Sequence, residues 1–275
     1  MSNGDFPTAQ ELDKLIAELR VYGGPDQVID FHTMQAELAL LPNAVPIASY
    51  LPSLDAAIGG FRAGELIVLS GPTKHGKTAL ARTWTRNFMQ QGKASLWFSY
   101  ELPTAEFLES FPELPEGYLP HELRGHALTW LYYRCLESKV KHGCQMIFID
   151  HLHFLVDMAH VKHPSLELGA IVRYLKRMAL ALDMTVFLLC HLTKLNYEQE
   201  PTEQDIRDSS FISQEADATL LIWRKSDPVN KGCFLNESTL VLRNHRRSGV
   251  MAKKIPLVFL QYGDRQGKGW LEEKL

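Results

Sequence analysis

Short runs of consecutive apolar residues recur along the chain from about residue 46, and stretches with apolar residues three or four apart lie between them. The runs have the length and composition of buried strands, and the intervening stretches have the periodicity of helices. Near-continuous apolar strands are typical of a mainly parallel sheet that helices cover on both faces. The main predicted strands lie at 65–70, 94–100, 146–150, 185–190, 218–223, 239–243 and 255–260, and the predicted helices at 78–92, 120–143 and 165–184.

A short amino-terminal region precedes this alternation. Residues 8–24 have the apolar spacing of an amphipathic helix and end in two glycines, which are common helix stops. A mixed segment follows and ends near residue 45. We therefore expect an α/β chain in two parts, a short helical N-terminal extension at 1–45 that is too small to be an independent domain, and a core at 46–275.

Residues 71–78 have the spacing of a phosphate-binding loop, and the predicted strand before them and helix after them are the context that such a loop requires. Small residues allow backbone N–H groups to close around a phosphate, and the helix amino terminus adds partial positive charge. A lysine here reaches the β- and γ-phosphates, and a threonine hydroxyl binds Mg²⁺. An accidental glycine-rich turn is the simpler alternative. The residues expected to contact nucleotide are Gly71, Pro72, Thr73, Lys74, His75, Gly76, Lys77 and Thr78.

Composition limits the class of protein. The chain has 275 residues, of which 45% are hydrophobic, so it can bury one large core. It has no run of ~18 apolar residues, and its first residues lack the basic and apolar regions of a signal peptide. We expect a soluble, cytoplasmic protein that does not bind membranes. The net charge of -3 excludes an overall basic coat for nucleic acid, although residues 243–254 form a local basic patch.

Polar residues end or follow three of the predicted strands, and ligands of parallel sheets bind at the carboxyl ends of the strands. Asp150 is a candidate to hold Mg²⁺ together with Thr78. Glu101 is a candidate to polarise the water that attacks a γ-phosphate, and His191 to hydrogen-bond that phosphate or water. Each also has a simpler interpretation: an acid that ends a strand, a solvated loop acid, and a core histidine.

Cysteine and histidine spacing gives little support for a metal cluster. The four cysteines have no paired spacing, so we expect reduced thiols that pack as small hydrophobic groups, at Cys135, Cys144, Cys190 and Cys233. Histidines cluster at His151, His153, His160 and His163, but no carboxylate or cysteine other than Asp150 lies at ligand spacing with them. Because Asp150 already has a proposed Mg²⁺ role, we do not expect the histidines to hold a metal.

The order of these segments resembles that of the DnaB-type replicative DNA helicases, which have the RecA-like P-loop NTPase core of superfamily four. The resemblance covers about residues 46–262 and implies that Glu101 activates water. At the position of His191 the family usually has glutamine, which is a departure. Residues 205–224 are similar to the family's DNA-contacting loop and the strand after it. The segments that carry the resemblance are 52–81, 98–102, 146–155, 168–192 and 205–224.

A basic turn resembles the last motif of this family, which supplies an arginine finger to the nucleotide of the neighbouring subunit. The resemblance places the finger at Arg246, and a shift of one residue would place it at Arg247. The family's basic partner of the finger falls on Asn244, for which Arg243 is a candidate substitute. A guanidinium at the γ-phosphate stabilises transition-state charge and contributes ~10³-fold or more in rate. A basic turn that faces water or binds a phosphate backbone is the simpler interpretation.

Two further segments, 156–164 and 196–210, are candidates to face a DNA strand. Basic and hydroxyl side chains and backbone N–H groups in them can hold phosphates without reading bases. The expected DNA contacts are Lys162, His163, Arg207, Asp208, Ser209 and Ser210.

The sequence and the resemblance together predict a ring-forming DNA helicase of DnaB type that hydrolyses ATP, or another nucleoside triphosphate, with Mg²⁺. The resemblance implies single-stranded DNA, further copies of the chain in a hexameric ring, and a primase or loader as partners, in a bacterial cell or in a virus or plasmid of one. A RecA/RadA-like recombination or remodelling ATPase is the alternative. The preferred nucleotide and the choice of hexamer or heptamer stay open. The predicted catalytic residues are Lys77, Glu101, Asp150, His191 and Arg246.

Overall fold

The chain divides into two compact units, Met1–Ala44 and Val45–Leu275. The computed structural model describes residues 7–40, 45–155, 164–191, 212, 214–227, 233–263 and 268–274. Within these ranges, every helix is too short or too polar to cross a lipid bilayer.

The first unit contains two helices, α1 (Ala9–Leu19) and α2 (Phe31–Ala39). A capping box begins α1: the Thr8 hydroxyl accepts a hydrogen bond from the Glu11 N–H, and the Glu11 carboxylate accepts one from the Thr8 N–H. Asp30 begins α2 by accepting from two backbone N–H groups of its first turn. The sequence pattern predicted α1 but not α2, which lies in the mixed segment.

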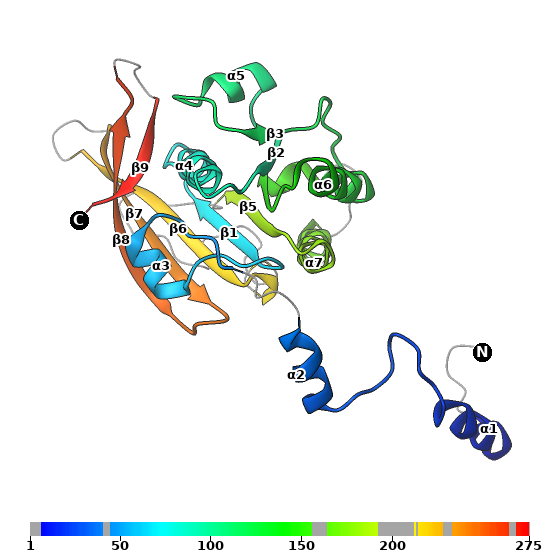
Figure 1. Cartoon of the computed structure of the whole chain (residues 1–275). Coiled ribbons are helices and arrows are strands. Elements are labelled where there is room, and N and C mark those ends of the chain that lie inside the picture. Colours follow the sequence, from blue (N-terminus) through cyan, green and yellow to red (C-terminus); the bar gives the residue numbers. More distant parts are fainter. Residues whose placement is uncertain are drawn as a thin grey trace. The chain divides into compact units, whose positions relative to one another are not determined.

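A nine-stranded sheet runs through the second unit, in the order β3-β2-β4-β5-β1-β6-β7-β8-β9 (Figure 1). The strands from β3 to β6 pair in parallel, whereas β7, β8 and β9 pair antiparallel. The predicted α/β fold with a mainly parallel sheet is therefore confirmed. The strands are β1 (Leu66–Gly71), β2 (Ser95–Ser99), β3 (Gly117–Tyr118), β4 (Met146–Asp150), β5 (Thr185–His191), β6 (Ala218–Ser226), β7 (Phe234–His245), β8 (Met251–Gln261) and β9 (Gly269–Glu273).

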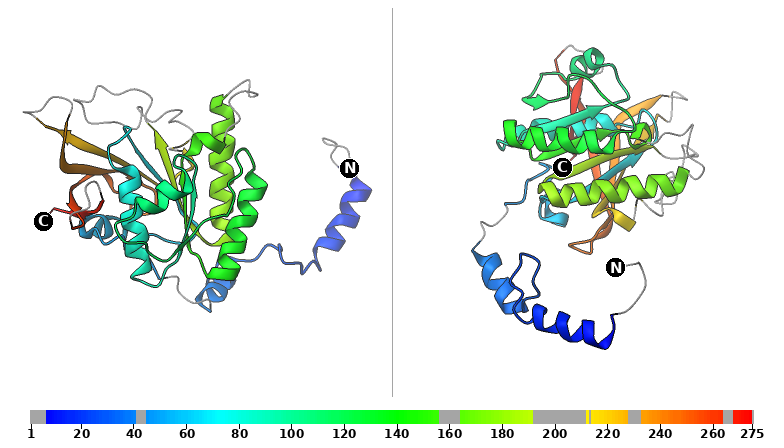
Figure 2. Two further views of the ribbon diagram at one scale, coloured as in Figure 1. Left: turned by 90° about the horizontal axis from the view of Figure 1, so that it is seen from above. Right: turned by 90° about the vertical axis from the view of Figure 1, so that its right-hand side faces the viewer.

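Helices cover both faces of this sheet. Figure 2 shows α6 and α7 side by side, and they contact each other on the face opposite α4. The helices of this unit are α3 (Pro52–Ile58), α4 (Lys77–Met89), α5 (Thr104–Glu109), α6 (Leu128–His142) and α7 (Pro164–Leu182), with a 3-10 helix η1 (Leu152–Leu155).

Each face of the sheet has its own hydrophobic core, because successive strand residues point to opposite faces. On β1, Ile67 and Leu69 belong to the core that contains Trp84 of α4 and Phe61. Leu66 and Val68 belong instead to the core formed with α6 and α7. Burial on both faces explains why β1 is apolar throughout rather than alternating.

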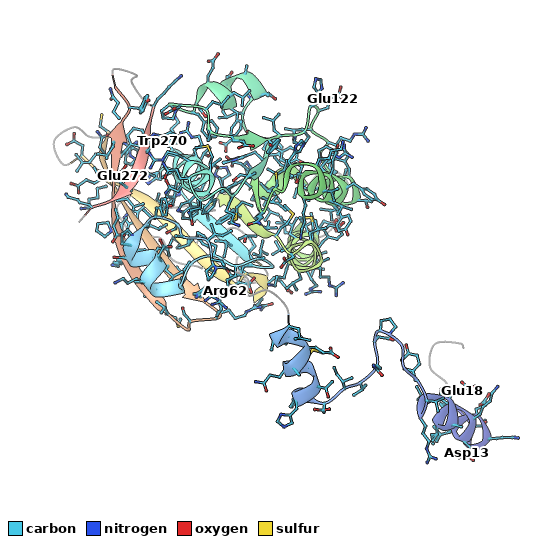
Figure 3. All side chains as sticks on the ribbon, in the orientation of Figure 1. Asp13, Glu18, Arg62, Glu122, Trp270 and Glu272 are labelled. Atoms are coloured by element: carbon cyan, nitrogen blue, oxygen red, sulfur yellow. The ribbon has the colours of Figure 1, made fainter. Side chains whose placement is uncertain are left out.

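The edge strand β9 packs against α4, the helix that follows the loop at 71–78 (Figure 3). The Arg86 guanidinium lies 4.7 Å from the centroid of the Trp270 ring and 3.9 Å from the Glu272 carboxylate. The Leu271 N–H donates a 3.0 Å hydrogen bond to the Thr83 hydroxyl. These contacts tie the carboxy-terminal strand to the helix that positions Lys77 and Thr78.

One predicted helix begins later than expected. The segment 120–143 was predicted as a single helix, but α6 begins only at Leu128. Pro120 and Gly125 disfavour a helix in the first part of the segment, and His126 adopts a left-handed conformation with φ 52°. The other predicted helices and the seven predicted strands form, all but β4 with shifted ends.

Candidate nucleotide-binding site

Lys77 begins α4 and its side chain curls back into the loop at 71–78. Its Nζ donates hydrogen bonds to the carbonyl oxygens of Gly71 (2.8 Å) and Pro72 (3.0 Å), and the residue is buried. Burial lowers the pKa of Lys77, while the charges of Asp150 and Glu101 oppose this lowering. The ammonium group is thus held inside the curve of the loop, where it satisfies backbone carbonyls.

Two glycines of this loop have different physical reasons to be glycine. Gly76 caps the start of α4 with φ 104°, a left-handed conformation that other residues rarely adopt. Gly71 has an ordinary φ, but a Cβ there would lie 2.2 Å from the backbone oxygen of Ile222 on β6. The first glycine of the motif is therefore required by packing between two strands.

Asp150 and Thr78 meet beside the loop. The Thr78 Oγ1 donates a 2.9 Å hydrogen bond to Asp150 Oδ2. The other carboxylate oxygen, Oδ1, is buried and has no hydrogen-bond partner in the described part of the chain. Burial raises the pKa of Asp150 to about 6, the Thr78 hydrogen bond lowers it, and nearby Glu101 raises it. A buried carboxylate oxygen that lacks a hydrogen-bond partner is suited to coordinate a cation.

Glu101 lies next to Asp150 because β2 and β4 are neighbours in the sheet. The Glu101 N–H donates to the Asp150 carbonyl at 3.3 Å, and the Tyr100 N–H donates to the same carbonyl at 2.7 Å. The Glu101 side chain is 38% exposed. Its carboxylate is therefore held near the buried Asp150 but stays open to water.

His191 ends β5, the next strand after β4, and its Nε2 lies 3.9 Å from Glu101 Oε2. Burial lowers the pKa of His191 to about 4, and the charge of Lys77 adds to the effect. The imidazole is therefore uncharged at neutral pH, so the contact with Glu101 is not an ion pair there. The structure brings Lys77, Thr78, Glu101, Asp150 and His191 to one edge of the sheet.

His75 contacts the antiparallel part of the sheet. Its Nδ1 accepts a 3.0 Å hydrogen bond from the Arg224 N–H on β6, and its ring centroid lies 4.5 Å from that of Phe234 on β7. Burial lowers the pKa of His75 to about 4, and Lys77 and Arg224 add to the lowering. His75 thus connects the loop to the antiparallel part of the sheet.

Arg246 lies at the opposite end of β1 from the loop. Its N–H donates to the Asp217 carbonyl at 2.7 Å, and its Nη1 lies 3.8 Å from the Asp217 carboxylate. That carboxylate also accepts from the N–H of Leu66, the first residue of β1. The structure therefore does not bring Arg246 to the loop of its own chain.

Arg247 is more buried than Arg246, although both guanidinium groups make contacts within the chain: that of Arg246 donates to the Gln214 carbonyl at 2.5 Å. The Arg247 guanidinium donates to Glu65 (3.2 Å) and to the Gly60 carbonyl (2.9 Å) of the same chain, and its side chain is 31% exposed, against 55% for Arg246. Of the two arginines, Arg246 is thus the more accessible to another molecule.

Comparison with known proteins decides the family. The sequence profile of the DnaB-like helicase C terminal domain matches residues 46–111 and 121–265, which is most of the chain. The chain belongs to the DnaB-like helicase family. It is 24% identical over 257 residues to the replicative DNA helicase DnaB of Treponema pallidum, an alignment that covers 82% of this chain and 56% of that protein. The chain spans about half of the length of the curated relatives that it matches.

Solved structures show the same fold. A DnaB-like replicative helicase, described with its interactions with primase, superposes with a TM-score of 0.71 at 18% identity and covers 94% of this chain and 71% of that one. A second solved structure, that of an ATPase domain, superposes with a TM-score of 0.71 at 18% identity and covers 87% of this chain and 96% of that one. The RecA-like architecture expected from the resemblance is thus confirmed.

The predicted DNA contacts all lie outside the described residues: Lys162, His163, Arg207, Asp208, Ser209 and Ser210.

Three of the four cysteines are buried as expected, but Cys233 is exposed, so the expectation of a packed thiol is wrong there.

Sequence reasoning missed two residues beside the loop. Arg82 is largely buried, lies one helical turn after Thr78, and its charge helps lower the pKa of Asp150. The four-residue spacing on a predicted helix was an available signal, because residues at this spacing share a face. His151 belongs to a local histidine cluster in the sequence, but in the structure its ring centroid lies 4.2 Å from that of His191. The two residues lie at the ends of the neighbouring strands β4 and β5, and sequence spacing does not show that these strands are neighbours.

Proposed function

We propose that this chain is the ATPase core of a ring-forming DNA helicase of DnaB type, which couples nucleotide hydrolysis to movement along single-stranded DNA and to duplex unwinding in replication. Residues 46–275 would form the core and residues 1–45 a helical linker, a boundary that the division of the chain after Ala44 supports. The observation that carries the proposal is the meeting of Lys77, Thr78, Asp150 and Glu101 at the carboxyl edge of the parallel sheet, where ligands of such sheets bind.

The first step of the proposal is nucleotide binding at the loop. Lys77 would exchange its bonds to the Gly71 and Pro72 carbonyls for bonds to β- and γ-phosphate oxygens. Thr78 and Asp150 offer oxygen ligands, which suit Mg²⁺, and Asp150 Oδ1 has no other partner among the described residues. Bound Mg²⁺ would neutralise charge on the phosphates.

The second step is activation of water. Glu101 has a backbone that is bonded to Asp150 and a carboxylate that is open to solvent, which suits the role of polarising the attacking water. The neutral His191 beside it can donate one hydrogen bond and accept another, which suits contact with a γ-phosphate or with that water. Neither role requires a charged histidine.

The third step is assembly. Arg246 is exposed and far from its own loop, which suits a finger that reaches the nucleotide of a neighbouring copy.

Apolar side chains are exposed on α1 at three- and four-residue spacing, and they suit docking on another copy: Leu12, Leu15, Ile16 and Leu19. We propose a hexameric ring around single-stranded DNA and a primase or loader as partner. The reported interaction of a similar helicase with primase supports that last proposal.

The experiment that tests the proposal measures ATP hydrolysis against protein concentration, with and without single-stranded DNA. Sites shared between copies predict a rate that rises more steeply than linearly until rings form, and stimulation by DNA. Glu101→Gln should bind nucleotide but lose hydrolysis. Unwinding of a forked duplex separates a helicase from a recombination-type ATPase, which would coat the DNA without processive unwinding. Full DNA-stimulated activity in an isolated single copy would contradict the ring.

A further inference from the structure

The carboxylate of Glu101 and the imidazoles of His151 and His191 form a compact group of possible metal ligands. One ligand atom from each residue can be chosen so that all three lie within 4.8 Å of one another. The His151 and His191 ring centroids are 4.2 Å apart, with the rings nearly perpendicular, and His191 Nε2 is 3.9 Å from Glu101 Oε2. We call this group the Glu101–His151–His191 triad.

Strand order explains why three residues so far apart in sequence meet. The strands β2, β4 and β5 are consecutive neighbours in the sheet and run parallel. Ser99 pairs with Asp150, and Asp150 pairs with Leu189, so the three strands end at nearly the same level. The residues of the triad follow or end these strands. The backbone of the sheet therefore brings the three side chains close together.

The surroundings hold the triad in place but leave it open. The His151 ring lies 4.9 Å from the Phe154 ring, which stacks on Tyr100 at 6.0 Å between centroids. Both histidines are partly buried, whereas Glu101 is exposed. The Nδ1 atoms of His151 and His191 are buried and have no hydrogen-bond partner in the described part of the chain. Neither Nδ1 atom is therefore held by a hydrogen bond to a described residue, and both rings can turn towards Glu101.

The chemistry of this donor set differs from that of Thr78 and Asp150. Two imidazole nitrogens and one carboxylate oxygen form a set that Zn²⁺ uses, with water as the fourth ligand. Magnesium prefers oxygen ligands and keeps its waters, so it would not compete well for imidazoles. Ligands of a tetrahedral zinc ion are roughly 3.3 Å apart, given bonds of about 2.0 Å. Rotation of the exposed Glu101 side chain can bring its carboxylate closer to the two imidazoles, and the imidazole rings must themselves turn to approach each other.

We propose that the Glu101–His151–His191 triad binds one divalent transition-metal ion, with Zn²⁺ the best fit, and that the bound ion inhibits nucleotide hydrolysis by occupying the Glu101 carboxylate. A carboxylate that coordinates zinc cannot also polarise the attacking water. Lys77 repels a cation at this place, and the carboxylates of Glu101 and Asp150 offset its charge. The inhibitory effect rests on the proposed function, whereas metal binding does not.

The binding experiment uses the full chain in a Cys233→Ser background, because Cys233 is an exposed thiol that could bind zinc by itself. Co²⁺ is titrated in excess Mg²⁺ while its visible absorption is recorded, and Zn²⁺ is then added to displace it. One Co²⁺ per chain with the absorption of a nitrogen- and oxygen-ligated four- or five-coordinate ion is expected. Co²⁺ binding that saturates without that absorption, or that reaches no defined number of ions per chain, would contradict the proposed site.

Substitutions locate the ion. His151→Phe keeps an aromatic ring against Phe154 but removes the ligand, and should weaken Co²⁺ binding at least about tenfold. Glu101→Gln should also weaken it. His142→Gln is the matched control, since His142 stacks on Tyr118, away from the triad, and should leave binding unchanged. His151→Asn serves if His151→Phe does not fold. Wild-type affinity in a folded His151 variant would overturn the proposal.

The activity experiment tests inhibition separately. With buffered free Zn²⁺, wild-type hydrolysis should fall and return when a chelator is added. His151→Phe, compared with its own rate without zinc, should resist inhibition when zinc is added. Undiminished wild-type hydrolysis at zinc concentrations that saturate the triad would overturn the inhibitory role. If the chain hydrolyses no nucleotide with Mg²⁺ alone, the proposed function fails, and the Co²⁺ titration still decides whether the site exists.

Discussion

Thr78 and Asp150 are joined by a 2.9 Å hydrogen bond that links the first turn of α4 to the last residue of β4. The Asp150 carboxylate is almost fully buried, and burial raises its pKa to about 6. Because the folded-state pKa lies above the unfolded value, ionised Asp150 destabilises the fold. The penalty begins as pH rises above the unfolded pKa, near 4, and is complete above about 6. The buried Asp150 carboxylate is well placed to bind a cation, and it therefore lowers the stability of the fold when no cation is bound.

Asp150→Asn should make the protein more stable and inactive. Asparagine can still accept the Thr78 hydrogen bond but carries no charge, so at pH 8 without Mg²⁺ it should add on the order of 2 kcal/mol. At ~2–4 °C per kcal/mol for a chain of this size, the melting temperature should rise by several degrees. Differential scanning calorimetry and an ATPase assay check both halves. Glu122→Gln, at an exposed loop, is the control and should change neither. A lower melting temperature for Asp150→Asn would contradict the burial argument.

The bond between the Arg224 N–H and His75 predicts sensitivity to acid. Burial lowers the pKa of His75 to about 4, so unfolded chains, in which histidine titrates near 6.5, take up the proton first. Stability should fall as pH drops from 6.5 towards 4, and at pH 5 His75 alone should account for a loss on the order of 1–2 kcal/mol. Urea unfolding at pH 8 and pH 5 measures it. His75→Asn should show a smaller difference between the two pH values than wild type, and equal differences would exclude His75 as a cause.

Packing between β1 and β6 predicts that Gly71 matters for folding as well as for nucleotide. Gly71→Ala would place a Cβ 2.2 Å from the Ile222 backbone oxygen, and rigid sheet backbone cannot move aside cheaply. We expect a loss of about 2 kcal/mol or more, visible as a lower melting temperature without nucleotide. Gly117→Ala is a matched control, because its Cβ would meet Ser95 at an ordinary 3.6 Å. Equal melting temperatures for the two variants would show that the strands can separate.

The sequence pattern predicts the central strands well because both of their faces are buried. The strands β1, β2, β4 and β5 are apolar along most of their length, and the last three end in or shortly before a polar residue that the parallel topology brings to one edge. That is why Asp150, Glu101 and His191 could be selected before their contacts were known. Local pattern cannot give strand order, and so it could not bring His151 together with Glu101 and His191.

The less successful predictions have local causes. The helix α2 has an aspartate cap but weak apolar periodicity, so its cap signal was not supported by a pattern. The start of α6 is delayed by proline, glycine and a left-handed His126, which outweigh the helical spacing around them. Apolar runs also do not distinguish parallel from antiparallel pairing, so the antiparallel arrangement of β7, β8 and β9 was not predicted.

Arg246 and Lys77 allow a test of shared active sites. Arg246 lies at the Leu66 end of β1, whereas Lys77 follows its other end, so one chain cannot bring them together without refolding the strand. Arg246→Ala and Lys77→Ala should therefore each be inactive, and a mixture should regain activity in rings where an intact loop meets an intact finger. At equal mixing, random assembly makes about a quarter of the interfaces competent.

Arg247→Ala is the control: it loses bonds to Glu65 and Gly60 of its own chain, so it should lower the melting temperature but hydrolyse ATP without mixing. Activity in Arg246→Ala alone, or none in the mixture despite ring formation, would assign the finger elsewhere.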